Sequence, residues 1–374
     1  MDDLLWTGGS YIEEKMKTIQ EKYNFGKVSV NKFTYCGRDV VKDSAGVHIS
    51  CPSLMDRVRP IVLTPEQRKD GNKDVDEKLR GQLRSVIGSL AWYARVCRPD
   101  LSYAVCKLQS SVHAATINDV KYANKVVELA KRDKNKGISY PSGSLRFEDA
   151  MVVALRDASH AADFDVSSSG QKLGHRSQSG RLLCLAAPDF REKQQGHLLL
   201  LEWHSTILKR VCRSTLQAET LSLLLGSEEA EHLRVVLYAI KDPAIHRPGW
   251  IVSAQDSICV DWYTDCRSLH QHVNQEGLHV VTDKRLAIDL SGIRQQAWRR
   301  EGEEHGDPLI TDRVPSDATT RLLWTSTDRM LADPLTKGMR HIGLEKLMTG
   351  AEVCLIPTKF KVCETEGGNA VETA

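Results

Sequence analysis

The chain has 374 residues, of which 41% are hydrophobic and 27% are charged. This length suits two or three domains, and this balance of residue types excludes both an intrinsically disordered chain and a membrane-embedded one. No apolar run approaches the roughly 18 residues that cross a bilayer, and the first residues do not resemble a targeting signal. The composition therefore predicts a soluble protein with no membrane partner.

The net charge of +2 conceals two halves of opposite sign. Residues 1–146 hold 25 Lys and Arg against 17 Asp and Glu, whereas the rest of the chain holds 26 against 32. A basic half suits contact with a polyanion and an acidic half suits divalent metal, although uneven solvated surface is the plain alternative. The 10 cysteines lack the short spacings of zinc sites, so we expect reduced thiols and an intracellular location.

Helical spacing dominates the first half of the chain, where two β-rich runs interrupt it. The elements expected there, in chain order, are a helix over residues 12–23 that stops at Gly26, a hairpin of Val28–Tyr35 and Val47–Ser50, a connector at Thr64–Lys78, and helices from Arg80 to Lys131 that break at Pro99 and near Asp119. The polar run Lys131–Ser144 is the expected domain boundary.

The second half of the chain alternates strands with helices. Its expected strands are Met151–Arg156, Arg181–Ala186, Leu198–Val211, Ile258–Thr264 and Arg321–Ser326, and its expected helices are Leu216–Ile240 and Asp283–Arg300. An initial run of strands followed by this alternation predicts a mixed sheet with helices packed on it. The segment Phe164–Gln178 is expected to be a polar insert, and Glu364–Ala374 a disordered tail.

Four acidic residues stand where solvation alone does not explain them. Asp157 closes an apolar strand and shares a face with its apolar neighbours, and Glu219 projects from the apolar stripe of a helix. Asp265 ends a later strand, and Asp333 precedes Pro334, as a helix N-cap does. Carboxylates that converge on one end of a sheet are most economically explained by bound metal, and two magnesium ions suit phosphodiester hydrolysis. On spacing alone, caps and turn formers are the alternative.

The sequence around each acid is similar to one of the four boxes of a known family. The boxes occur here in the family's order as Asp157–Ser159, Ser214–Thr220, Thr264–Leu269 and Leu331–Lys337. Together they resemble the RNase H domain of copia-type retrotransposon Pol polyproteins. Two further segments, Glu202–Val211 and Asp283–Asp289, are similar to the third strand of that domain and to the helix after its third box.

The resemblance implies a fold, a reaction and a set of ligands. The implied fold is α/β, an RNase H-like five-stranded mixed sheet with flanking helices over residues 148–348, followed by a C-terminal tail at 349–374. The implied enzyme is a ribonuclease H-type endonuclease that hydrolyses the RNA strand of RNA–DNA hybrids. Its implied catalytic residues, which would hold two Mg²⁺ ions that Mn²⁺ could replace, are Asp157, Glu219, Asp265 and Asp333. The implied location is the cytoplasm, a virus-like particle or the nucleus.

The resemblance extends upstream of these boxes. Arg84–Tyr93 and Arg98–Ala104 are similar to the segment that closes the copia-type reverse transcriptase domain, and Phe33–Gly37 is similar to the hairpin before it. The pair Asp2 and Asp3 resembles the second half of the polymerase's Tyr-x-Asp-Asp box. The first 140 residues are therefore expected to be a C-terminal fragment of reverse transcriptase, with a truncated palm and a helical connection segment.

Basic and aromatic residues near the four acids give weaker signals. Lys209, Arg210 and Arg213 could contact the phosphates of a hybrid, although a solvated strand end explains them equally well. Trp203 and Trp262 fit strand cores better than base stacking. Two other interpretations of the chain stay open: a non-catalytic or nucleic-acid-binding relic of a decayed element, and a truncated gene model of a complete polyprotein.

Primer extension on an RNA template tests the reverse transcriptase fragment. A polymerase needs a further Asp from an earlier palm strand and the fingers that bind the incoming nucleotide, and the sequence contains neither before Asp2. We therefore expect the purified chain to incorporate no nucleotide under conditions in which a complete reverse transcriptase extends the primer. Measurable incorporation would contradict this expectation.

Overall fold

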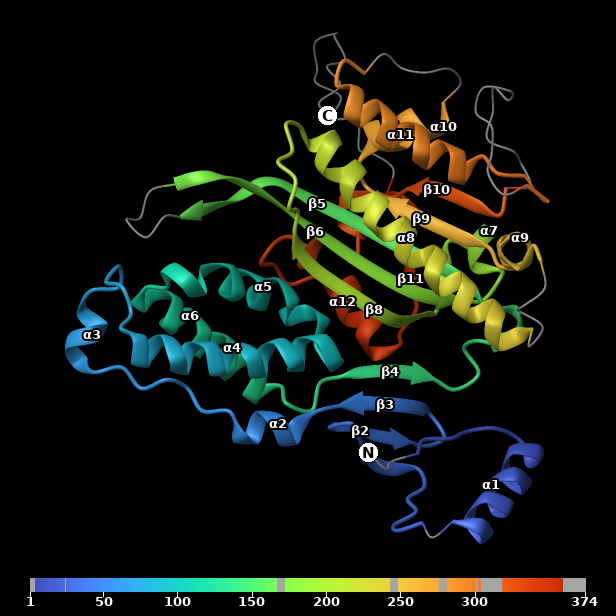
Figure 1. Cartoon of the computed structure of the whole chain (residues 1–374), viewed down its shortest axis with the longest axis horizontal. Helices are drawn as coiled ribbons and strands as arrows, with labels where there is room; N and C mark the ends of the chain where they lie inside the picture. Colours follow the sequence, from blue (N-terminus) through green and yellow to red (C-terminus); the bar gives the residue numbers. More distant parts are fainter. Residues whose placement is uncertain are drawn as a thin grey trace, which may run out of the picture.

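The computed structural model describes residues 4–23, 25–166, 172–242, 248–275, 281–300, 302–303 and 318–358. The pair Asp2 and Asp3 and the tail Glu364–Ala374 lie outside these residues. Figure 1 shows a small sheet beside the N-terminal helix, a group of helices, and a larger sheet flanked by further helices. Within the described ranges, no helix is both long enough and apolar enough to cross a membrane.

The small sheet is antiparallel and has four strands. Their order is β1 (Lys32–Tyr35), β2 (Arg38–Lys42), β3 (Gly46–Ser50) and β4 (Ile138–Pro141). The expected hairpin was wrong because β2 lies between its two strands. Cys36 and Gly37, both with positive φ, form a two-residue turn that reverses the chain between β1 and β2. The helix expected over residues 12–23 is confirmed as α1 (Ser10–Lys22).

Strand β4 comes from the run that was expected to be a polar boundary. It pairs with β3, and Gly137 before it lies so close to β3 that an added Cβ would be 2.0 Å from the carbonyl oxygen of Ile49. Ile138 is buried in the core of the larger sheet, and the Tyr140 hydroxyl donates a hydrogen bond to the carbonyl of Leu200 at 2.8 Å. Because β4 contacts both sheets, this run packs between them and is more than a connecting segment.

Helices form the second part of the molecule, and all of them except α3 contribute to one apolar core. They are α2 (Pro52–Arg57), α3 (Pro65–Lys69), α4 (Glu77–Cys97), α5 (Ser102–Ser111) and α6 (Ile117–Arg132). The expected break at Pro99 is confirmed, since a short 3₁₀ helix, Pro99–Leu101, separates α4 from α5. The expected connector was partly wrong because it contains α3, whose first turn is closed by reciprocal hydrogen bonds between Thr64 and Gln67.

The larger sheet has five strands and is mixed. Its order is β10 (Thr320–Trp324), β9 (Val260–Thr264), β5 (Met151–Val166), β6 (Lys172–Ala186) and β8 (Leu198–Ile207). Strands β10, β9 and β5 run parallel, whereas β6 is antiparallel to both of its neighbours. The expected mixed sheet is confirmed, and its arrangement is consistent with an RNase H-like fold. The expected polar insert was wrong at its ends, because Phe164–Val166 and Lys172–Gln178 are strand residues.

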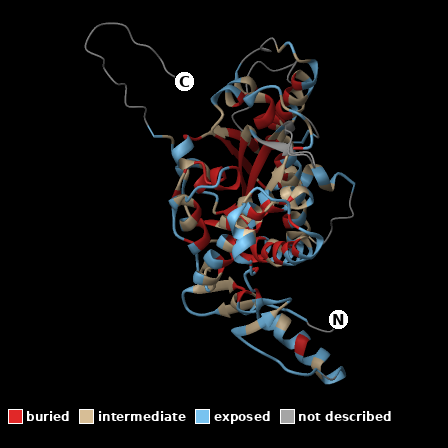
Figure 2. Ribbon diagram, turned by 90° about the vertical axis from the view of Figure 1, so that its left-hand side faces the viewer, coloured by how far each residue is buried: buried red, intermediate tan, exposed pale blue. Residues whose placement is uncertain are grey.

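Helices cover both faces of the larger sheet (Figure 1). One face packs against α8 (Thr215–Lys241), α10 (Arg267–Asn274) and α11 (Lys284–Ala297), and the other against α12 (Ile342–Thr349). The short elements α7 (Phe190–Lys193), β7 (Gln195–Gly196), α9 (Trp250–Ser257) and β11 (Val353–Cys354) complete the unit. The chain stays ordered past Met348, since β11 pairs with β7 and Leu355 is buried. Figure 2 shows that buried residues fill the sheet and its helices but are few in the small sheet and α1.

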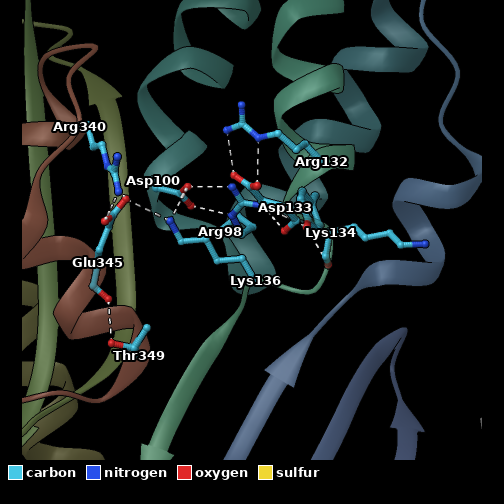
Figure 3. A network of polar contacts seen from close by, with 10 residues as sticks. Arg98, Asp100, Arg132, Asp133, Lys134, Lys136, Arg340, Glu345 and Thr349 are labelled. Atoms are coloured by element: carbon cyan, nitrogen blue, oxygen red, sulfur yellow. Dashed lines mark hydrogen bonds and ion pairs between the residues drawn. The ribbon is translucent and has the colours of Figure 1, made fainter.

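Polar contacts join the helical group to α12 (Figure 3). The fully buried guanidinium of Arg98 donates two hydrogen bonds of 2.8 Å to the carboxylate of Asp100. The ammonium of Lys136 lies 3.6 Å from Asp100 and 3.5 Å from Glu345 of α12. On β8, the Trp203 indole N–H donates a hydrogen bond of 2.8 Å to a carbonyl of α4. The helices and the larger sheet therefore pack as neighbours through specific buried groups.

A glycine in α8 makes room for a buried arginine of the central strand. Arg156 on β5 is only 1% exposed, and its guanidinium donates to the carbonyls of Leu182 at 3.0 Å and Gly226 at 2.6 Å. A Cβ added at Gly226 would lie 1.4 Å from Nε of Arg156. The helix can approach the sheet this closely only because residue 226 has no side chain.

Alanine substitution of two helical glycines tests this packing. Gly226→Ala should lower the free energy of unfolding by about 2–4 kcal/mol, because the new methyl group overpacks the core and displaces a buried charge. Gly292→Ala in α11, where the added Cβ would meet open space, should instead be neutral or raise it by up to about 1 kcal/mol. Urea unfolding of the two variants measures both, and equal stabilities would contradict the close packing at Gly226.

Candidate metal centre

Three of the four expected acids meet at one end of the larger sheet. Asp157 lies within β5, two residues past the stretch Val152–Leu155 that pairs with β9, and Asp265 directly follows β9, the parallel neighbour of β5. A short 3₁₀ helix, Asp333–Leu335, brings the third carboxylate to the same place. One carboxylate oxygen from each of the three acids lies within 4.8 Å of the others. This acid group is the only such cluster of potential metal ligands among the residues that the structure describes.

The segment that carries Asp333 is seated closely on the sheet. An added Cβ at Gly180, the register partner of Asp157 on β6, would lie 2.8 Å from the carbonyl oxygen of Ala332 and 2.8 Å from the Thr336 methyl carbon. The expectation that Asp333 is an N-cap was wrong: Ala332 holds the cap position and Asp333 is the first residue of the 3₁₀ helix. Its carboxylate therefore does not cap the helix, and it accepts a hydrogen bond of 3.0 Å from the ammonium of Lys337.

Glu219 lies beside the acid group without belonging to it. It is 3% exposed, in the first turns of α8, where Ser214 caps the helix by accepting a hydrogen bond from the Gln217 amide. One carboxylate oxygen of Glu219 accepts a hydrogen bond of 3.2 Å from the backbone N–H of Ala158, next to Asp157. The other oxygen is buried and has no hydrogen-bond partner among the described residues. A buried carboxylate oxygen without a partner is costly unless a cation completes it.

Burial and like charge make Asp157, Glu219 and Asp265 harder to ionise in the absence of metal. Burial, with the charges of Asp333 and Asp265, raises the pKa of Asp157 to about 7. Burial, with the charge of Asp157, raises the pKa of Glu219 well above its ordinary value. Burial also raises the pKa of Asp265, although the Thr327 hydroxyl opposes this shift by donating a hydrogen bond of 2.8 Å. Bound divalent cations would reverse these shifts by stabilising the ionised forms.

Two neighbours of the acid group were not singled out from the sequence. Thr336 donates a short hydrogen bond to Asp157 Oδ2, and Lys337 places its ammonium 3.9 Å from the same oxygen. Burial alone would lower the pKa of Lys337, but the charges of Asp157 and Asp333 outweigh this effect and raise the pKa. Both residues lie within the box Leu331–Lys337, so the spacing of that box was the signal that could have identified them.

The donor atoms fit a hard divalent cation. The acid group and Glu219 offer only carboxylate oxygens, which are the protein ligands that Mg²⁺ and Mn²⁺ prefer over nitrogen and sulfur. The acid group could therefore bind a metal ion and is compatible with Mg²⁺. The unpaired oxygen of Glu219 is the observation that favours an additional cation at this end of the sheet.

The basic residues near α8 are only partly free to contact a ligand. Arg210 forms an ion pair of 3.0 Å with Asp289 of α11, whereas the side chains of Lys209 and Arg213 are exposed. The expected core positions of Trp203 and Trp262 are confirmed, with 8% and 0% exposure. Contact between Lys209, Arg210 or Arg213 and a nucleic acid stays a prediction.

Comparisons with known proteins give two related matches. The chain is 25% identical over 280 residues to the "Retrovirus-related Pol polyprotein from transposon RE2" of Arabidopsis thaliana. It has the same identity and matched length with the Pol polyprotein from transposon RE1 of that plant. Each match covers 74% of this chain but only 15% of the relative. No family model matches the chain, and no solved structure matches it significantly.

The pH dependence of stability tests the crowding of these acids. A carboxyl group whose pKa is about 7 when folded and about 4 when unfolded binds its proton more tightly in the folded state. Stability of the metal-free protein is therefore lost as pH rises through this window. Asp157→Asn removes the ionisable group, so the stability of the variant relative to wild type should increase between pH 5 and pH 8.

Urea unfolding in a metal chelator measures this difference at both pH values. Asp261→Asn is the matched control, because Asp261 is a buried aspartate of β9 that accepts two hydrogen bonds from Arg321. Loss of that ion pair should destabilise the protein at both pH values. A stability difference between Asp157→Asn and wild type that does not change in favour of the variant from pH 5 to pH 8 would contradict the like-charge crowding.

Proposed function

We propose that this chain, a relative of the Pol polyproteins of copia-type retrotransposons, hydrolyses the RNA strand of RNA–DNA hybrids in a metal-dependent reaction. The observation that carries this proposal is the acid group, in which one carboxylate oxygen from each of the three acids lies within 4.8 Å of the others, beside the inner strands β5 and β9 of a mixed sheet. The order of the four acids along the chain and the position of Glu219 beside the group support it further.

Each acid would act as a ligand whose orientation is fixed by the fold. Two magnesium ions bound there would supply the Lewis acidity that phosphodiester hydrolysis by water needs. Asp157, Asp265 and Asp333 would hold them, together with the unpaired oxygen of Glu219. The hydroxyls of Thr336 and Thr327 donate to Asp157 and Asp265 respectively and so fix two of these carboxylates.

The proposed substrate is recognised through its backbone. RNase H-type cleavage of a hybrid depends on helix shape and on phosphate and sugar contacts, so we expect little sequence preference. The exposed cations Lys209 and Arg213 precede α8, whose Glu219 lies at the site, and would contact phosphates of the bound hybrid. Residues 1–140 would derive from the reverse transcriptase portion of such a polyprotein.

A second candidate function is nucleic-acid binding without catalysis. The excess of Lys and Arg over Asp and Glu in residues 1–146, 25 against 17, favours it independently of the acid group. Hydrolysis is the stronger proposal because a backbone-binding role alone does not explain two buried carboxylates and one half-buried carboxylate that repel one another. The two candidates differ in the activity that they predict on a hybrid.

Cleavage of a labelled hybrid by the full chain tests the proposal. The wild-type chain should cut the RNA strand of a hybrid in Mg²⁺ or Mn²⁺ and spare the same RNA when it is single-stranded. Asp265→Asn should reduce cleavage by at least about a hundredfold, since it removes one charge from a site that holds two doubly charged ions. Circular dichroism should show an unchanged fold.

The matched control is Asp189→Asn, which removes an exposed aspartate paired with Lys193. This control should cleave like wild type, because Asp189 lies next to α7 and not in the acid group. A folded wild-type chain that binds the hybrid but does not cut it across titrations of both metals would favour the non-catalytic function.

A further inference from the structure

Lys337 provides a cation within the acid group itself. Its ammonium lies 3.0 Å from Oδ1 of Asp333 and 3.9 Å from Oδ2 of Asp157, so it contacts two of the three carboxylates. The adjacent Thr336 donates to the same oxygen of Asp157 and to the carbonyl of Asp333. The turn after the 3₁₀ helix Asp333–Leu335 therefore places a positive charge and a hydroxyl against the same two acids.

The ammonium and a divalent cation would need the same oxygens. The acid group with Glu219 offers at most four negative charges, Lys337 contributes one positive charge, and two divalent ions contribute four. With Lys337 in place, the first divalent ion leaves a net charge of −1, so the second ion would make the site net positive, whereas without Lys337 it would make the site neutral. A lone pair of Asp333 Oδ1 that accepts the ammonium is also not available as a metal ligand.

The side chain of Lys337 has room to leave these oxygens. It is 44% exposed, whereas Asp157 and Asp333 are almost fully buried at 3% and 4%. The carboxylates are fixed by the sheet and by the contact at Gly180, but the ammonium is held only by the acids that it contacts among the described residues. A competing cation could therefore displace Lys337 without rearranging its ligands.

We propose that Lys337 is an internal counterion that competes with divalent metal for Asp333 and Asp157 and so weakens the binding of the second ion. In the metal-free protein, the ammonium relieves the repulsion between the carboxylates. When two ions bind, it gives up these oxygens and turns toward solvent. This inference rests on the proposed function, because it takes the acid group to be a metal centre.

Metal titration of the full chain without nucleic acid tests the proposal. Mn²⁺ binding is followed by the electron paramagnetic resonance signal of the free ion, in wild type, Lys337→Met and Lys337→Arg. Lys337→Met should bind the weaker of two ions at least about tenfold more tightly, since a unit charge about 4 Å from the ligands is removed. Lys337→Arg keeps the charge and should bind like wild type.

In the absence of metal, loss of the Lys337 charge should destabilise the protein, and unfolding measurements test this. In a chelator, Lys337→Met should unfold at lower urea concentration than wild type, and saturating Mn²⁺ should stabilise it more than it stabilises wild type. Lys42→Met, which removes an exposed lysine of β2, is the control for loss of one positive charge and should change neither quantity.

The outcomes separate this inference from the proposed function. A Lys337→Met variant that binds Mn²⁺ no more tightly than wild type overturns the counterion role. If wild type binds Mn²⁺ and Asp265→Asn abolishes this binding, the metal centre is still supported. Absence of Mn²⁺ binding by both wild type and Lys337→Met would contradict the metal centre and, with it, the proposed hydrolysis.

Discussion

Repulsion between carboxylates at one end of the larger sheet is the constraint around which this part of the molecule is built. Asp157, Asp265 and Asp333 are held within 4.8 Å, and burial makes their charges more costly than in water. Such an arrangement lowers the stability of the metal-free chain and persists only if the surrounding structure fixes it. The pairing of β5 with β9 and the close packing of residues 332–336 against Gly180 supply that rigidity.

Elsewhere in the same sheet, a buried carboxylate is paired with arginines. Asp261 of β9 is fully buried but accepts two hydrogen bonds from Arg321 and lies 3.8 Å from Arg191. There the two arginines offset part of the cost of burying the charge, as buried ion pairs usually require. At the acid group, the protein supplies one half-exposed lysine for three carboxylates. This difference in compensation separates a structural acid from a set that is incomplete without further cations.

The positions of most acids of the candidate site could be predicted, because they follow the periodicity of strands and helices. Asp157 follows the apolar residues Met151–Leu155 within β5, Asp265 follows the short apolar strand β9, and Glu219 lies on an apolar helical stripe, so their places follow from the strand and helix periods. Asp333 was harder, because a proline after an aspartate suits both a helix cap and the 3₁₀ turn that is found. Thr327 could not be predicted, since its contact with Asp265 spans 62 residues and has no local pattern.

The errors in the fold have similar causes. Strand β4 was missed because its residues Ile138–Pro141 are few and end in proline, and pairing with the distant β3 outweighs this weak local signal. The extended ends of β5 and β6 were missed because their sequences are polar, although each strand completes the hydrogen bonds of the other. The five-stranded core was predictable because its strands are apolar and alternate with long helices.

The claim that the acid group is a metal centre is tested most directly by anomalous diffraction from a crystal of the full chain soaked in Mn²⁺. Two anomalous peaks should appear among the carboxylates of Asp157, Asp265, Asp333 and Glu219, with the Lys337 ammonium no longer in contact with Asp333. A crystal at saturating Mn²⁺ with no peak among these residues, and with Lys337 still paired with Asp333, would contradict the account.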